Sequence, residues 1–295
     1  MASKPIVAAT DGSEESLRAV DWAAREAALR GAPLRIVSAA AVLPRMASRV
    51  DTSEEYADVT DVLLKDRDQA LAAAAERAAK AAPGLLIDTD QLSGGVAQAI
   101  TDSGSGALML VVGSRGRGAF TALVLGSVSR YVASHASCPV VVLRDETSAA
   151  RRQVGVGVAD LDGCGDSLTF AFEEASLRQA SLMAIHSWHA PQADISRAGE
   201  SFTPAEPHTV EAEVARQLEA LLDSWRGKYP DVPVSQDIVH GHPGRALVGL
   251  SARADLVVIG RRAEHPEHPE RPGPGSVRHA LLNHAHGPVA VVPSA

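Results

Sequence analysis

Residues 110–127 read Leu-Val-Val-Gly-Ser-Arg-Gly-Arg-Gly-Ala-Phe-Thr-Ala-Leu-Val-Leu-Gly-Ser and give the strongest indication of the fold class. It continues an apolar run, Ala107 to Val112, passes through a glycine-rich segment and ends where a helical pattern begins. A continuous apolar strand followed by a helix is typical of a parallel strand buried on both faces of a sheet. Ligands of such sheets bind beyond the carboxyl ends of the strands, where the strand order reverses. The loop from Gly113 to Ser127 is therefore the first candidate site.

The chain repeats itself at an offset of 148 residues. Residues 25–34 read Arg-Glu-Ala-Ala-Leu-Arg-Gly-Ala-Pro-Leu, and residues 173–182 read Glu-Glu-Ala-Ser-Leu-Arg-Gln-Ala-Ser-Leu. Further on, residues 138–142 resemble residues 287–291, each with a proline before a valine-rich run. The order and spacing indicate duplication of a whole domain. We predict one domain at 1–147 and a second at 153–295.

Strand and helix signals alternate within each half. In the first half they predict strands at 5–10, 34–39, 85–91, 107–112 and 139–143, with helices at 13–30, 54–82, from a Ser93 cap to about 103, and at 126–134. The pattern predicts an α/β, Rossmann-like fold of two tandem open parallel five-stranded sheets with helices on both faces. The last strands, Val140–Leu143 and Val289–Val292, are apolar edges, so we expect them to join the halves as an intrachain pseudo-twofold pair.

Composition excludes several classes of function. The 295-residue chain has a net charge of −8 and 3% aromatic residues, which argues against a nucleic-acid partner. It shows no signal-peptide pattern and no apolar run long enough for a membrane span, so we expect a cytoplasmic protein with no membrane partner. Cys138 and Cys164 read as free thiols, and the pair His284/His286 matches no known ligand spacing, so no metal site is predicted.

The glycine-rich loop has the chemistry of a phosphate site. Its glycines let the backbone approach a ligand, and backbone N–H groups in such loops can cradle phosphate oxygens. Ser127 stands at a helix start, where the helix dipole favours an anion, and Arg115 and Arg117 add positive charge. A Walker A loop is excluded because no lysine is near, and a dinucleotide GxGxxG motif is disfavoured because the loop follows the fourth strand.

Glycine, two residues, glycine, nine residues, glycine and serine is a spacing that resembles the nucleotide signature of ATP-binding universal stress proteins. The resemblance covers both halves and is closest to the tandem-domain members, whose fold is adenine-nucleotide-hydrolase-like. It implies that Asp11 contacts adenosine, that the backbone of Ala39 contacts adenine, and that the loop binds ribose and phosphates. The resemblance and the loop chemistry together predict a nucleotide site of Thr10, Asp11, Ala39, Gly113, Arg115, Gly116, Arg117, Gly126, Ser127 and Val128. The expected ligand is ATP, with or without Mg²⁺, and ADP and AMP are the alternatives.

The second half departs from this pattern. Ala263 stands where the second glycine belongs, and the interval between the outer glycines is longer in the second half than in the first. Prolines and glutamates in residues 261–274 remove backbone donors and add negative charge, which opposes phosphate binding. We expect the second site to be weak, altered or empty; its candidate residues are Asp160, Ser187, Gly260, Gly275 and Ser276.

Three hypotheses for function follow. The first is a nucleotide-binding sensor or regulator in stress response, acting on an unidentified protein partner. The second is a slow Mg²⁺-dependent ATPase that relies on Asp11; no catalytic residue is predicted, because the loop from Gly113 to Ser134 has no His, Asp or Glu to orient water. The third is a nucleotide-free interaction scaffold. Whether two chains form a homodimer is left open.

Overall fold

The computed structural model describes residues 3–39, 53–116, 125–144, 150–159, 161, 163–188, 207–261 and 276–294. The strands of the first half are β1 (Ile6–Ala9), β2 (Leu34–Ala39), β3 (Ile87–Leu92), β4 (Met109–Gly113) and β5 (Val140–Leu143), and its helices are α1 (Glu14–Arg30), α2 (Ser53–Ala81), α3 (Val96–Ser103) and α4 (Ser127–His135). The strands of the second half are β6 (Gln153–Val158), β7 (Ser181–Trp188), β8 (Val234–His240), β9 (Leu256–Arg261) and β10 (Val289–Pro293), and its helices are α5 (Gly165–Leu177), α6 (Pro207–Lys228), α7 (Pro243–Ser251) and α8 (Ser276–His284). No helix within these ranges is long and apolar enough to cross a membrane.

The ten strands form one sheet in the order β3-β2-β1-β4-β5-β10-β9-β6-β7-β8. Pairing is parallel within each half, and the halves meet where β5 and β10 pair antiparallel, with Val141 opposite Ala290. The expected joining of the halves through their last strands is thereby confirmed. The two expected five-stranded sheets are the two halves of a single ten-stranded sheet, because hydrogen bonding between the apolar edges makes the sheet continuous.

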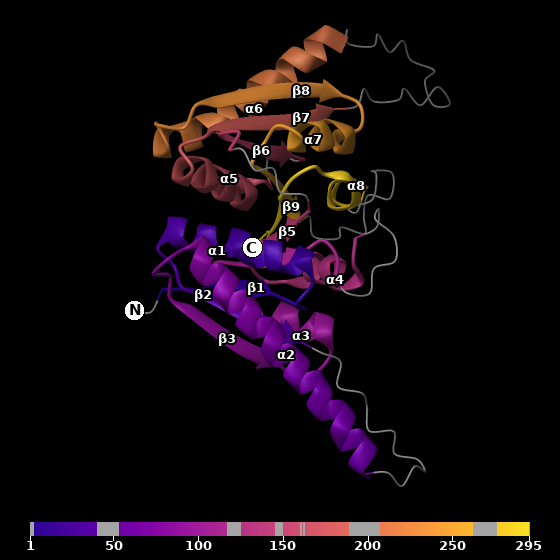
Figure 1. Ribbon diagram of the computed structural model, residues 1–295. Coiled ribbons are helices and arrows are strands. Elements are labelled where there is room, and N and C mark those ends of the chain that lie inside the picture. The colour runs from indigo at the N-terminus through magenta and orange to yellow at the C-terminus, as the bar shows by residue number, and fades with distance from the viewer. Residues whose placement is uncertain are drawn as a thin grey trace, which may run out of the picture.

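Helices cover both faces of the sheet (Figure 1). One core cluster joins α1, α2, α5 and α6 to one face, through residues such as Ile6 and Ala8 of β1. The other joins α3, α4, α7 and α8 to the opposite face, where Val7 and Ala9 point. Successive side chains of a strand alternate between faces, so a strand with helices on both sides must be apolar throughout. This explains the unbroken apolar runs in the sequence.

Local signals set both ends of α1, whereas the start of α3 differs from the prediction. Ser13 caps α1 by accepting a hydrogen bond from the Ser16 amide, and Gly31 ends the helix in the left-handed conformation, as predicted. The prediction that Ser93 caps the third helix is wrong, because the N-cap of α3 is Gly95. The intervening Gly94 has a φ of 107°, and this left-handed turn delays the start of the helix.

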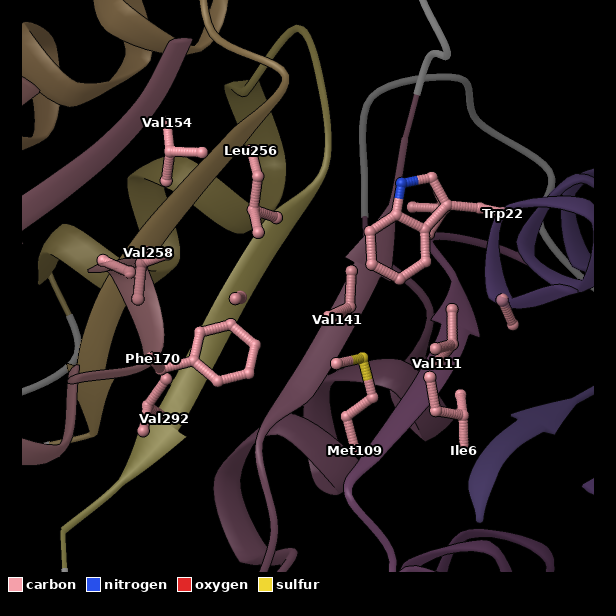
Figure 2. Packing of buried hydrophobic residues seen from close by; sticks show 14 of the residues in the cluster. Ile6, Trp22, Met109, Val111, Val141, Val154, Phe170, Leu256, Val258 and Val292 are labelled. Carbon is pink, nitrogen blue, oxygen red and sulfur yellow. The ribbon is translucent and has the colours of Figure 1, made fainter. Parts of the chain in front are cut away.

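Trp22 of α1 and Phe170 of α5 belong to a core cluster that runs from one half into the other. Figure 2 shows Phe170 beside Val292 in the C-terminal half and Trp22 near Val141 in the N-terminal half. The two aromatic residues are separated by the same 148 positions as the sequence repeat. The contact surface between the halves is therefore built from equivalent faces of α1 and α5, as in a twofold-symmetric interface.

Candidate functional site

A cavity of about 460 Å³ lies at the carboxyl ends of β1, β2 and β4. The structure brings every predicted residue of the first site to its wall except Arg117, which lies outside the described residues. The lining is formed by Ala9, Thr10, Asp11, Ser16, Ser38, Ala39, Asp66, Arg67, Ala70, Val96, Ile100, Val112, Gly113, Arg115, Gly116, Gly126, Ser127, Val128 and Ser129. β1 pairs with β2 on one side and β4 on the other, so the site stands where the strand order reverses.

Asp11 is held in a defined orientation by the turn that follows β1. Its Oδ1 accepts hydrogen bonds from the Ser13 amide at 3.0 Å and the Ser13 hydroxyl at 2.6 Å. Ser16 Oγ lies 3.0 Å from Thr10 Oγ1 and accepts from the Asp11 amide at 3.3 Å. Asp11 therefore stabilises the turn with its carboxylate and lies at the wall of the cavity.

Two glycines of the loop are required by close packing. A Cβ atom at Gly116 would lie 2.3 Å from Asp11 Oδ2, so this glycine lets the loop rest against the carboxylate. A Cβ atom at Gly113 would lie 3.0 Å from the backbone oxygen of Glu15, so this glycine lets β4 end against the first turn of α1. Gly113 thus acts on the site through the packing of α1.

The first turn of α4 lies at the wall of the cavity. Gly126 is the N-cap and carries no side chain with which to satisfy the amides of that turn. Ser129 Oγ donates to the Gly113 carbonyl at 2.7 Å, which ties the helix start to the end of β4. An N-cap without a side chain, at the wall of a cavity, is suited to an anion.

Sequence reasoning missed Asp66 and Arg67, which α2 brings to the cavity from above the β2–β3 end of the sheet. Arg67 is 9% exposed, and its guanidinium donates to the carbonyl of Ser38 at 3.3 Å and that of Leu92 at 2.5 Å. No motif marks these two residues, because only the packing of α2 on the sheet brings them to the site. In the sequence they lie within a run of four charged residues, 65–68, on a helix that carries several other charged positions beside its alanines.

The described part of the cavity contains two buried donors without hydrogen-bond partners, Arg67 Nε and Arg115 Nε. Arg67 belongs to the end of the cavity at β2 and β3, and Arg115 follows β4. A buried N–H without an acceptor destabilises the protein by about 1–3 kcal/mol. Binding of a ligand that brings an acceptor to either group would therefore be favoured.

The residues predicted for a second site are placed only in part. Ser187 donates to the carbonyl of Gly241, Gly260 is exposed in β9, and Ser276 begins α8. Asp160 and Gly275 lie outside the described residues, as does most of the proline-rich insert. In the parts of the chain that the structure does describe, no three His, Cys, Asp or Glu side chains are grouped to hold a metal ion.

Comparisons with known proteins agree with the fold. A model of the universal stress protein family matches residues 2–144 and again residues 150–293. Universal stress proteins Rv2005c and Rv1996 of Mycobacterium tuberculosis H37Rv are 33% and 30% identical to the chain; each alignment covers 97% of the chain and 96% and 94% of the relative, respectively. A universal stress protein from Archaeoglobus fulgidus DSM 4304 superposes with a TM-score of 0.71, covers 99% of both chains at 17% identity, and bears on the fold alone. The chain therefore belongs to the universal stress protein family, with both of its halves matching the family pattern.

Proposed function

We propose that the N-terminal half binds an adenine nucleotide, ATP with Mg²⁺ in the first place, and that binding regulates a protein partner in stress response. The observation that carries the proposal is the convergence of Asp11, Ala39, Arg115 and the α4 N-terminus on one cavity. These groups come from three strand ends that are far apart in the sequence. They offer a carboxylate, a cation and backbone donors, which together match the hydroxyls and phosphates of a nucleotide.

The nucleotide would lie across the strand ends. The base is assigned to the end of the cavity formed by Ala39 and Arg67, and the phosphates to Arg115 and the first turn of α4. When bound, Mg²⁺ would neutralise charge on the phosphates, and Asp11 and Asp66 are the carboxylates in the described lining. A regulatory role requires that the ligand bind one shape of the chain more tightly than another.

Calorimetry with ATP and Mg²⁺ on the full chain and on Asp11→Asn tests the proposal. The amide keeps an oxygen that can accept from Ser13, so the turn is retained while the negative charge is lost. Hydrogen bonds to charged groups contribute about 1.5–3 kcal/mol, so we expect the variant to bind at least about tenfold more weakly. Asp102→Asn, at an exposed carboxylate of α3 that does not line the cavity, is the matched control and should bind like the wild type.

The same proteins and ligands distinguish the other hypotheses. Release of phosphate that depends on Mg²⁺ and is lost in Asp11→Asn would indicate a slow ATPase. Absence of binding by ATP, ADP, AMP and cyclic AMP, in protein shown to be purified without nucleotide, would refute the proposal and leave an interaction scaffold. Binding at two sites per chain would show that the second half has kept a functional site.

A further inference from the structure

A residue of the C-terminal half bonds the segment that leads to the N-terminal cavity. Asn283 of α8 accepts a hydrogen bond from the Leu125 amide, with 3.1 Å between Leu125 N and Asn283 Oδ1. Both residues are buried, at 6% exposure for Asn283 and 3% for Leu125, and they are 158 positions apart in the chain. A buried bond between the two halves therefore ends on the segment that enters α4.

The orientation of the Asn283 side chain is set by a second contact. Its Nδ2 donates to the His279 carbonyl at 2.8 Å within α8. With the amide nitrogen engaged by a carbonyl, the amide oxygen is the atom that faces Leu125 N–H. An apolar side chain of the same size would leave the Leu125 amide buried without an acceptor.

The Leu125 peptide directly precedes the candidate anion site. Gly126, the next residue, donates its amide to the Ser114 carbonyl at 2.9 Å, and Ser127 then begins α4. The Leu125 carbonyl accepts from Arg130 of α4 at 3.4 Å. Leu125 is thus held on its amide side by the C-terminal half and on its carbonyl side by α4 itself.

The corresponding position of the N-terminal half has a different role. α4 and α8 have the same length, and Asn283 stands where α4 has Ser134. Ser134 donates to the Arg130 carbonyl of its own helix. Among the described residues, Asn283 therefore bonds the loop of the other half, whereas Ser134 bonds its own helix.

We propose that Asn283 is a positioning residue for the N-terminal nucleotide site, through which the C-terminal half holds the end of the loop in the shape that receives phosphates. The inference rests on the proposed function. Fixing Leu125 orients the peptide that leads into the Gly126 cap. The backbone N–H groups at the start of α4 are therefore ordered before the ligand binds. The C-terminal half, whose own loop departs from the glycine pattern, then helps to shape the site of the N-terminal half.

The test uses the full chain with Asn283→Leu, which keeps the number and branching of the side-chain heavy atoms and removes both hydrogen-bonding atoms, and with Asn283→Ala as a second variant. Calorimetry measures ATP with Mg²⁺ and adenosine separately on each protein. Loss of a neutral hydrogen bond corresponds to about a three- to tenfold change, so we expect ATP to bind about fivefold more weakly while adenosine keeps the wild-type affinity. Arg261→Ala is the matched control, because it removes another bond between the halves, from Arg261 to the Ala136 carbonyl at 2.6 Å, at the far end of α4.

The contrast between ATP and adenosine distinguishes positioning from general damage to the fold. Unchanged ATP affinity in both Asn283 variants, with a wild type that binds, would overturn the inference and leave the proposed function standing. An equal loss of ATP and adenosine would also overturn it. A wild type that binds no nucleotide would refute the proposed function, and the inference with it.

Discussion

Glu26 of α1 and Glu174 of α5 are buried at equivalent positions on the two sides of the junction, and each pairs with the same two arginines. Arg30 bonds Glu26 at 2.6 Å and also Glu174, while Arg178 bonds Glu26 at 2.5 Å and also Glu174. The arginine guanidinium groups lie 5.7 Å from the ring centroids of Phe170 and Trp22, respectively. The sequence repeat therefore appears in space as a symmetric, charged centre that joins the halves.

The first prediction concerns the pH dependence of this centre. Burial raises the pKa of Glu174 to about 7, and this outweighs the lowering by Arg178 and Arg30. The folded state then holds a proton that the unfolded state releases above its ordinary carboxyl pKa. The contribution of Glu174 to stability is therefore full at low pH and is lost as the pH rises toward and through about 7.

Glu174→Gln removes this titration, so its free energy of unfolding should fall less between pH 5 and pH 8 than that of the wild type. Urea unfolding at the two pH values measures the difference. Glu173→Gln changes the adjacent carboxylate, which is outside the ion-pair network, and should follow the wild type. Parallel pH profiles for Glu174→Gln and the wild type would contradict the assignment.

The second prediction separates helix capping from anion binding at α4. Gly126 has the extended backbone of an N-cap, with φ −60° and ψ 147°, and a Cβ atom there meets nothing closer than 3.4 Å. In Gly126→Ser the hydroxyl should accept from an amide of the first turn, which stabilises the fold by about 0.5–1 kcal/mol. The same hydroxyl competes with phosphate, so ATP should bind about threefold or more weakly. Urea unfolding and calorimetry measure the two opposite effects.

Gly113→Ala is the counterpart of this experiment. Its Cβ atom would press on the Glu15 backbone, which cannot move away as a flexible side chain can. We expect a loss of stability of about 1–3 kcal/mol from this overpacking. If Gly126→Ser were destabilised to the same degree, the distinction between the two glycines would be refuted.

The third prediction concerns Arg67. In Arg67→Leu the carbonyls of Ser38 and Leu92 lose a donor, which should cost about 1–3 kcal/mol of stability. Because the proposal assigns the base to the end of the cavity at Arg67, adenosine and ATP should both bind more weakly, unlike the result expected at Asn283. Thermal unfolding together with titration of both ligands provides the measurement.

Arg35→Leu serves as the control for Arg67→Leu. Arg35 also lies beside the β2–β3 pair, where it forms a partly exposed ion pair with Asp90, but it does not line the cavity. Partly exposed pairs contribute about 0–1 kcal/mol, so the control should be mildly affected and bind nucleotide normally. Equal binding losses in the two variants would argue against a role for Arg67 in the site.

Much of this protein was determined by its sequence alone. The repeat, the unbroken apolar strands and the spacing of Gly113, Gly116 and Gly126 predict two α/β halves, their junction at β5 and β10, and the end of the sheet at which the cavity lies. These features are local patterns: residues close together in the sequence indicate which strands are buried, where helices end and where the chain turns tightly. The start of α3 escaped prediction because a left-handed glycine displaced the expected serine cap.

The distant residues that complete the cavity and the junction are brought together by the packing of the whole chain. Arg67 bonds Ser38 from 29 positions away, Asn283 bonds Leu125 across 158 positions, and Arg30 reaches Glu174 from the other half. A sequence pattern specifies that a helix packs on a sheet, but not the angle and depth at which it packs. Because those depend on the fit of all the side chains between layers, the polar contacts at the ends of the layers exist only once the whole core has formed.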